Sequence, residues 1–127
     1  MSTINRFEDI ETWKMARRLV REIYAMSNEG KFSRDYAFRD QIRRAAVSII
    51  SNIAEGFESQ TQALFITYLA RAKASAGEVR AQLYLAFDLG YINQEEFSTL
   101  IREIKQISRS LYKFIKYLRS QPNTNRY

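Results

Sequence analysis

The sequence predicts an all-α fold, an up-and-down bundle of four antiparallel helices in one domain. Four glycines and a single proline interrupt the 127 residues, so long helices joined by short turns are favoured. Apolar residues recur at the 3.6-residue period of amphipathic helices. A composition of 46% hydrophobic and 27% charged residues is typical of an ordinary globular domain. One compact domain of four helices is therefore expected.

The first two helices are expected over residues 9–27 and 34–55. The first has acidic residues at its positive N-terminal end and stops in the turn NEGKFS. Ser33 is the predicted N-cap of the second helix, because its hydroxyl can accept a hydrogen bond from a free backbone N–H. Gly56 is predicted to close that helix in the left-handed conformation, which glycine adopts without a Cβ penalty.

The third and fourth helices are expected over residues 60–89 and 94–119, which completes a bundle domain over 1–119 and leaves 120–127 as a flexible tail. Ser59 with Gln62, and Asn93 with Glu96, have the spacing of a capping box, and Gly90 is expected to end the third helix. The predicted core stripes are Trp13, Ala16, Leu19, Val20 and Ile23; Ile42, Ala45, Ala46, Ile49 and Ile53; Phe65, Leu69, Ala72, Ala76, Val79 and Leu83; and Leu100, Ile104, Ile107, Leu111 and Leu118.

The second and third helices carry more apolar surface than one bundle core needs. On the second helix Ser48, Asn52 and Glu55 are confined to a narrow polar flank, and the third has an extra stripe of small residues that would let another backbone approach. Such faces usually mark interaction sites, so a homo-oligomer is expected, with the polar flank at its edge. A fully buried helix pair in an asymmetric bundle is the alternative. The predicted oligomer interface is Val47, Ile50, Ala54, Ala70, Ala74, Gly77 and Ala81.

Positive charge is concentrated near the C-terminus. Residues 1–96 hold 13 basic and 13 acidic residues, whereas residues 97–127 hold seven basic and one acidic, which accounts for the net charge of +6. The first and fourth helices are neighbours in such a bundle, so basic strips on both should border one surface, away from the oligomer interface. This surface would attract polyanions, although a merely solvated face is the alternative. The predicted nucleic-acid contacts are Arg102, Lys105, Arg109, Lys113, Lys116, Arg119, Lys14, Arg17, Arg18 and Arg21.

Catalytic, metal and cofactor sites are not expected. The chain has no cysteine and no histidine, which removes thiolate nucleophiles, the usual proton shuttle at neutral pH and the commonest metal ligand. It lacks both an Asp-rich calcium loop and a Gly-rich phosphate loop. No signal sequence or membrane-spanning apolar run is recognisable, so a cytoplasmic protein without a membrane partner is expected.

Three segments resemble those of a known family: FEDIETWKMAR, QIRRAAVSIISNIAEGFE and QLYLAFDLGYI. In order and spacing they are similar to the motifs of four-helix-bundle proteins encoded in intervening sequences of bacterial 23S ribosomal RNA genes. The resemblance covers nearly the whole chain, and NIAEG after RRAA is its most specific part. At Ile50, where family members commonly carry proline, the sequence departs from the pattern, so a proline kink is not carried over to the second helix.

The resemblance implies a left-handed bundle that assembles as a ring, a pentamer, with no established enzymatic role. The accessory variability protein of diversity-generating retroelements is similar in fold, and it is a basic pentamer that engages a reverse transcriptase and nucleic acid. A reverse transcriptase is therefore a further partner that the resemblance implies for this chain.

Three classes of function follow. The first is a non-enzymatic basic homo-oligomer that binds RNA or DNA backbone, as an accessory factor to a reverse transcriptase where the retroelement resemblance applies. The second is an oligomeric scaffold for a protein partner, with no direct nucleic-acid binding. An enzyme ranks last, because no convergent pocket can be assembled from the sequence. No interleaved row of exposed aromatic residues is expected on the fourth helix, which predicts nonspecific backbone binding rather than base stacking.

Overall fold

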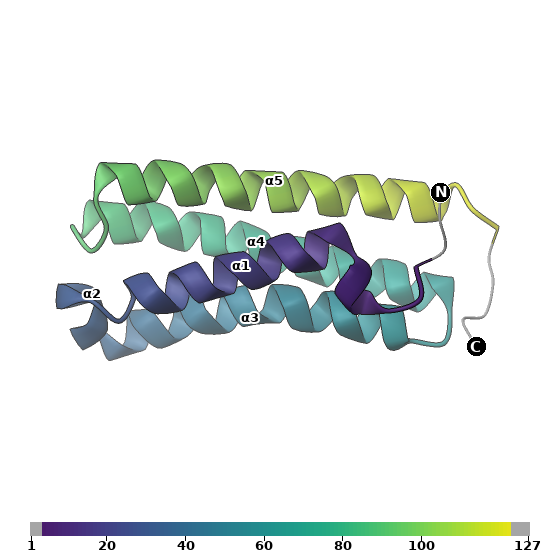
Figure 1. Ribbon diagram of the computed structural model, residues 1–127, viewed down its shortest axis with the longest axis horizontal. Coiled ribbons are helices and arrows are strands. Elements are labelled where there is room, and N and C mark those ends of the chain that lie inside the picture. The colour runs from purple at the N-terminus through teal and green to yellow at the C-terminus, as the bar shows by residue number, and fades with distance from the viewer. Residues whose placement is uncertain (1–3, 123–127) are drawn as a thin grey trace.

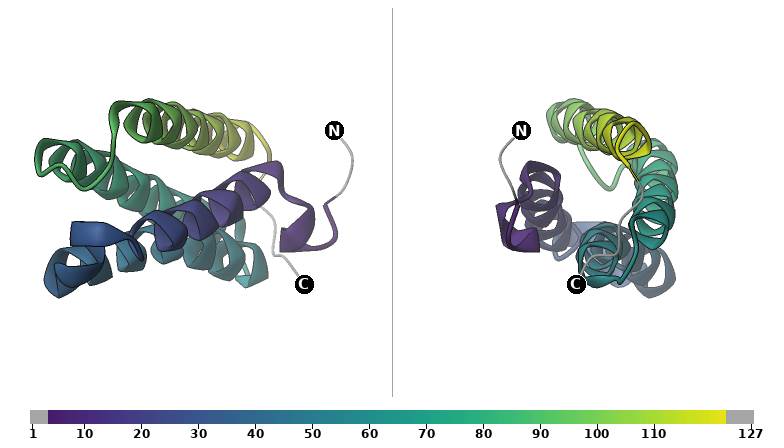
Figure 2. Two further views of the ribbon diagram at one scale, coloured as in Figure 1. Left: turned by 60° about the vertical axis from the view of Figure 1, so that its left-hand side comes forward. Right: turned by 90° about the vertical axis from the view of Figure 1, so that its right-hand side faces the viewer.

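The computed structural model describes residues 4–122, and they form an antiparallel helical bundle (Figure 1). Its elements are η1(Phe7–Asp9), α1(Glu11–Met26), α2(Gly30–Arg34), α3(Tyr36–Glu58), α4(Gln62–Asp88) and α5(Gln94–Arg119). Seen end-on, α1 lies diagonally opposite α4, and α3 lies diagonally opposite α5 (Figure 2). No strand occurs within residues 4–122, so the predicted all-α helical fold is confirmed.

The predicted apolar stripes form one core along the bundle. Every residue of these stripes is buried except Trp13 and Val20, which pack half-buried against it. At the end near the short helix α2, Phe32 stacks against Phe38 and Tyr91, with ring centroids 5.6 and 5.2 Å apart. Aromatic pairs at this spacing add to the stabilisation from buried area, so α2 closes this end of the core.

Two helix starts differ from the sequence prediction. Ser33 lies inside α2, and Asp35 caps α3 instead, its carboxylate accepting a hydrogen bond from the Phe38 N–H at 3.3 Å. The Thr61 hydroxyl caps α4 by accepting from the Leu64 N–H at 3.1 Å, so the predicted capping box at Ser59 is wrong. Ser, Thr and Asp are all good N-caps, so clusters of them leave the first helical residue ambiguous.

Gln62 is not part of a capping box because its side chain reaches across the bundle. It is buried, and its Nε2 donates to the backbone oxygens of Leu118 at 2.6 Å and Gln121 at 3.2 Å. Carbonyls at a helix C-terminus lack partners within the helix, so this amide satisfies the end of α5. Residues 123–127 of the predicted tail lie outside the described residues.

The ends of α4 and α5 agree with the sequence prediction. Gly90 follows α4 with a left-handed φ of 75°, a conformation that costs glycine little. The Asn93 side chain accepts from the Glu96 N–H at 2.8 Å, and the Glu96 carboxylate accepts from the Asn93 N–H at 2.9 Å. The predicted capping box of α5 is therefore confirmed.

Gly56 does not end a helix, which corrects the prediction that α3 stops there. The helix continues to Glu58, and Gly56 is absent from the positive-φ glycines of the described chain. A Cβ at Gly56 would lie 2.8 Å from the Tyr68 Cβ and 2.9 Å from the Phe65 Cδ1. The missing side chain therefore lets α3 and α4 approach closely near the turn that joins them.

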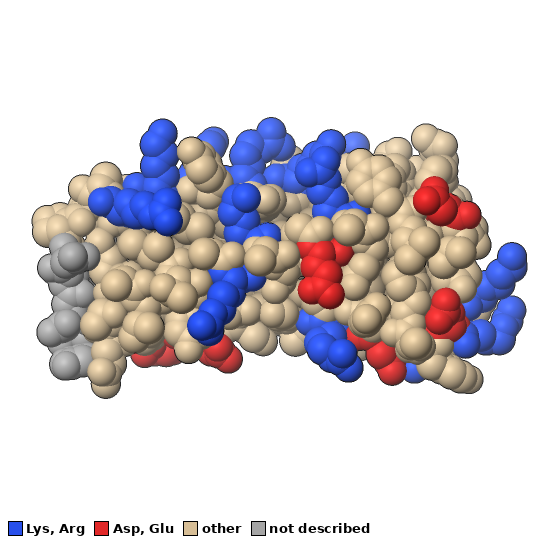
Figure 3. Space-filling view, turned by 180° about the vertical axis from the view of Figure 1, so that it is seen from behind, with Lys and Arg blue, Asp and Glu red and all other residues tan. Residues whose placement is uncertain are grey.

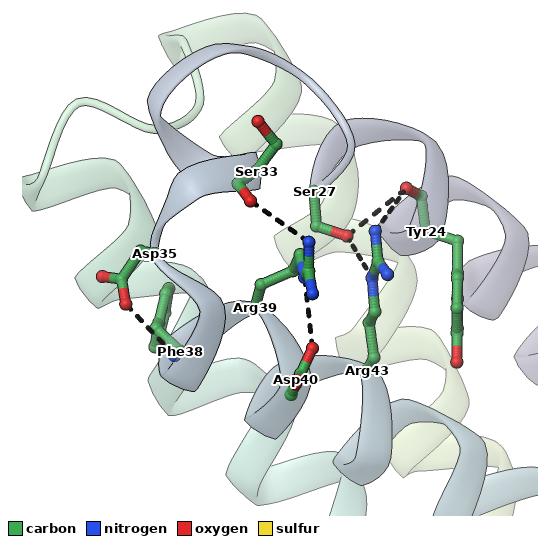
Figure 4. Close-up of polar contacts among 8 residues, drawn as sticks. All are labelled: Tyr24, Ser27, Ser33, Asp35, Phe38, Arg39, Asp40 and Arg43. Atoms are coloured by element: carbon green, nitrogen blue, oxygen red, sulfur yellow. Dashed lines mark hydrogen bonds and ion pairs between the residues drawn. The ribbon is translucent and has the colours of Figure 1, made fainter.

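Arg43, in the RRAA segment, ties α3 to the end of α1 (Figure 4). Its guanidinium donates to Ser27 Oγ at 2.7 Å and to Tyr24 O at 3.4 Å, and it lies 4.5 Å from the centre of the Tyr24 ring. Ser27 is buried, and its hydroxyl also donates to Tyr24 O. Arg43 thus satisfies polar groups at the end of α1 and fixes the α1–α3 packing.

Candidate nucleic-acid interface

The basic residues predicted on the fourth helix form a row of exposed side chains on α5. This α5 strip consists of Arg102, Lys105, Arg109, Lys113, Lys116 and Arg119, all exposed. Within residues 4–122 none of them forms an ion pair. Figure 3 shows Lys and Arg side chains in a nearly continuous row along the edge where α5 lies. No ion pair within the described chain therefore neutralises the positive charge of this edge.

Glu103, the only acidic residue of α5 after Glu96, does not belong to this row. It faces Glu22 of α1, and burial together with a hydrogen bond to that carboxyl group raises the pKa of Glu103 from 4.5 to about 7. The nearby cations Arg18 and Arg102 lower this pKa in part. Near neutral pH Glu103 therefore carries less negative charge than an ordinary glutamate, which leaves the α5 strip more positive.

Replacing Glu103 with Gln should stabilise the protein above pH 7. The folded-state pKa is raised above the ordinary value, so the stability of the wild type should fall as the pH rises from about 4.5 to about 7 and then level off. Because Glu103 is only half-buried and solvent still screens its charge in part, the gain should be only about 1 kcal/mol. Chemical denaturation at pH 5 and pH 8 would measure it. An equal effect of the substitution at both pH values would contradict the raised pKa.

The basic residues predicted on the first helix are partly engaged within α1 itself. Lys14 pairs with Glu11 at 3.4 Å, and the Arg17 guanidinium lies 5.5 Å from the centre of the Trp13 ring. The side chains of Arg18 and Arg21 are exposed, and the positive charge of Arg18 lowers the pKa of Glu103 in part. Since α1 packs beside α5, these basic residues of α1 border the α5 strip. Fewer of them are free of interactions with other side chains, because Lys14 and Arg17 are already engaged.

A groove between α4 and α5 gathers cations from both helices. Two hollows, with volumes of about 490 and 410 Å³, share Lys73 and Tyr112 in their lining and so lie next to each other; together they are called the α4–α5 groove. Lys105 and Arg109 line the first hollow, and Arg119 lines the second. The remaining lining residues of the groove are Ala70, Ala74, Ala76, Gly77, Arg80, Ile104, Ser108 and Ile115.

This arrangement corrects the prediction that the basic strips lie away from the small residues of the third helix. Ala70, Ala74 and Gly77 line the same groove as Lys105 and Arg109. The small residues therefore open a hollow beside the α5 strip, which a bulkier side chain at these positions would fill.

The sequence reasoning missed Lys73, Arg80 and Tyr112. Lys73, Gly77 and Arg80 are spaced by four and three residues, so they share one side of α4, and this spacing is the signal that could have found them. Two tyrosines of α5 are exposed, Tyr112 at 54% and Tyr117 at 37%, and although they form no row, Tyr112 lines the groove. An aromatic ring therefore stands among the cations of the groove.

The residues predicted for the oligomer interface do not form one surface. Three of them, Val47, Ile50 and Ala54, are half-buried on α3. They follow Arg43 by four, seven and eleven residues and so share its side of the helix. Arg43 bonds to Ser27 at the end of α1, so this is the side of α3 that meets α1. The small residues of α4, Ala70, Ala74, Gly77 and Ala81, are exposed, and the first three line the groove beside α5. The two sets thus lie on opposite flanks of the α3–α4 pair.

The polar flank of the second helix has a role inside the bundle. Ser75 of α4 donates to the Ser48 hydroxyl at 2.9 Å, and the Asn52 amide donates to Ser48 Oγ and to its backbone oxygen, at 3.0 and 2.8 Å. Glu55 remains exposed. Ser48 and Asn52 therefore hydrogen-bond where α3 packs on α4 within one chain, which explains two of the polar residues in this apolar segment.

The described residues offer neither a metal-ion cluster nor a membrane-spanning helix. Between residues 4 and 122, no cluster of three or more Asp or Glu side chains is arranged to hold a metal ion. None of the helices in that range combines the length and apolar character that crossing a membrane requires.

Comparison with known proteins identifies relatives of the chain. The sequence profile of the family described as 23S rRNA-intervening sequence protein matches residues 8–113. A crystal structure from Bacteroides thetaiotaomicron, described as a protein with unknown function from the S23 ribosomal protein family, is similar with a TM-score of 0.76. The two chains are 25% identical over 83% of this chain and 98% of that chain. A search of curated proteins finds no match.

Proposed function

The chain belongs to the 23S rRNA-intervening sequence protein family, and we propose that it is a non-enzymatic protein that binds the backbone of RNA or DNA. The observation that carries the proposal is the α5 strip, a row of six exposed cations without ion pairs in the described chain. Phosphate contacts of this kind supply most of the nonspecific affinity of proteins for nucleic acids.

The position of Glu103, the acidic residue nearest to the α5 strip in sequence, supports the same proposal. Surface helices commonly intersperse both signs of charge, and a carboxylate within the row would weaken its attraction for phosphate. Glu103 instead faces Glu22, with a pKa near 7. The α5 strip rises roughly 25 Å along the helix axis from Arg102 to Arg119, which is long enough to follow several phosphates.

Binding of labelled RNA and DNA at a series of salt concentrations tests the proposal. Fluorescence anisotropy should show a dissociation constant that rises steeply with salt, because each neutralised phosphate releases counterions. Little dependence on base sequence should accompany this effect. An absence of binding at low salt, or an affinity that salt does not change, would contradict the proposal.

A scaffold for an acidic protein partner is the alternative, since the same cations would attract carboxylates. Competition separates the two functions, because polyglutamate of matched charge should displace RNA poorly if phosphate is the preferred ligand. Displacement by polyglutamate as effective as by unlabelled RNA would favour the scaffold.

Two further properties stay predictions from the resemblance. One is assembly of a left-handed bundle into a pentameric ring, and the other is association with a reverse transcriptase. Exposed small residues on one flank of the α3–α4 pair and half-buried apolar residues on the other are compatible with head-to-tail contacts, which close into rings. Light scattering coupled to size exclusion would decide the subunit number. In a ring the α5 strip would be repeated, which would add avidity to weak contacts.

A further inference from the structure

We propose that the α4–α5 groove holds a single strand of nucleic acid, with a base stacked on Tyr112. This inference rests on the proposed backbone binding and specifies where the strand lies and in which form it is bound. It differs from binding on an open helix face, because cations of both helices line the groove and the aromatic ring of Tyr112 lies among them.

Cations from two helices converge on the groove. Lys73 and Arg80 come from α4, and Lys105, Arg109 and Arg119 come from α5. Phosphates within the groove would therefore meet positive charge on both sides, whereas a strand lying on the outer ridge of α5 would meet it on one side. None of these five cations is ion-paired to a described residue of the chain.

The floor of the groove is open because the residues there are small. A Cβ added at Gly77 would meet nothing within 4 Å, and Ala70 and Ala74 continue this surface along α4. Packed helices lie only about 8–10 Å apart, so a groove between two of them suits one extended strand better than a duplex. Each hollow is also within the range of about 300–1,000 Å³ that is usual for small-ligand sites.

Tyr112 stands where the two hollows meet and lines both of them. More than half of its surface is exposed, and within residues 4–122 its ring makes no aromatic or cation–π contact and its hydroxyl no hydrogen bond. By contrast, the exposed rings of Tyr24 and Tyr36 lie under Arg43 and Arg39. Stacking on an aromatic ring between cations is a common way to bind single strands.

The test compares oligonucleotides that differ only in their bases. We expect wild-type protein to bind a labelled oligouridine of about twelve nucleotides roughly tenfold more tightly than an abasic strand of equal length, because only the former can stack. Tyr112→Ala should abolish this difference, and Tyr112→Phe should keep it. A duplex of the same length should bind more weakly than the single strand. Tyr117→Ala is the matched control, since Tyr117 is exposed on α5 but does not line the groove.

The outcomes separate this inference from the proposed function. If wild-type protein binds all strands with the same salt dependence, whether or not they have bases, and Tyr112→Ala behaves like Tyr117→Ala, backbone binding stands and the groove inference is overturned. If wild-type protein binds none of the strands at low salt, the proposed function itself fails. Equal affinity for oligouridine and for polyglutamate would overturn the inference in favour of an acidic protein partner. Circular dichroism of each variant verifies that it is folded.

Discussion

Replacing Gly56 with Ala should destabilise the protein by about 2 kcal/mol. The new Cβ would lie 2.8 Å from the Tyr68 Cβ, 2.9 Å from the Phe65 Cδ1 and 3.3 Å from the Phe65 backbone oxygen. Two of these atoms belong to the backbone or its first side-chain carbon, so relief requires that α3 and α4 move apart. Overpacking of this kind costs about 1–3 kcal/mol, occasionally more. Urea denaturation followed by circular dichroism would measure the loss.

Gly77→Ala is the matched control, because it makes the same chemical change in the interior of α4. Its Cβ would meet nothing within 4 Å, so only the helix propensity changes, and alanine should stabilise the protein by about 0.5–1 kcal/mol. Opposite signs for the two variants would isolate the packing effect at Gly56. Stabilisation by both substitutions would show that α3 and α4 tolerate the extra methyl group and that the close approach is not required.

Gly56 also shows where sequence reasoning reached its limit in the fold. The long helices and their buried faces were predictable, because a regular apolar period over many residues leaves little choice of structure. A glycine near a predicted helix end has two common uses, a left-handed closing residue or a site of close packing. Only the closeness of Tyr68 and Phe65 to Gly56 distinguishes these uses here, and that closeness depends on how α4 packs against α3.

The turns illustrate a similar ambiguity. Ser59 and Thr61 both precede the apolar run of α4, and either could cap it by its hydroxyl group. The observed start frees Gln62 to bond the end of α5, a contact over 56 positions of sequence that no local pattern contains. Asn93 and Glu96 were predictable because both hydrogen bonds of a capping box are local.

The part of the candidate interface that lies on a single helix was predictable, and the part formed between two helices was not. The α5 strip follows from spacings of three and four residues along α5, which a helical wheel shows directly. The groove depends instead on which side of α4 packs beside α5. Lys73 and Gly77 face α5, whereas Ser75 faces α3 and bonds to Ser48. A helical wheel of α4 shows the stripe of small residues but not that α5 packs beside it. The position of these small residues next to the α5 cations was therefore missed.

Reversing two charges of the α5 strip should have the largest effect on binding. Arg109 and Lys113 are both exposed, and their replacement by Glu would remove two phosphate contacts and add repulsion in their place. The slope of log affinity against log salt should become shallower by about 2 on duplex DNA, and affinity near 0.1 M salt should fall by about tenfold or more. Anisotropy titrations with labelled RNA and DNA at several salt concentrations would measure both quantities.

A control with the same change in net charge shows whether the position of the cations matters. Lys31 and Arg34 are exposed on α2, at the end of the bundle far from the C-terminal half of α5 (Figure 1). Lys31→Glu/Arg34→Glu should therefore lower the affinity only slightly and leave the salt slope unchanged, because these residues make no phosphate contact in the proposed complex. If both double variants lose the same affinity, the net charge of the whole protein governs binding and the α5 strip is no site. If neither loses affinity, the strip is an ordinary solvated helix face, since its cations then make no contact that salt or substitution can weaken.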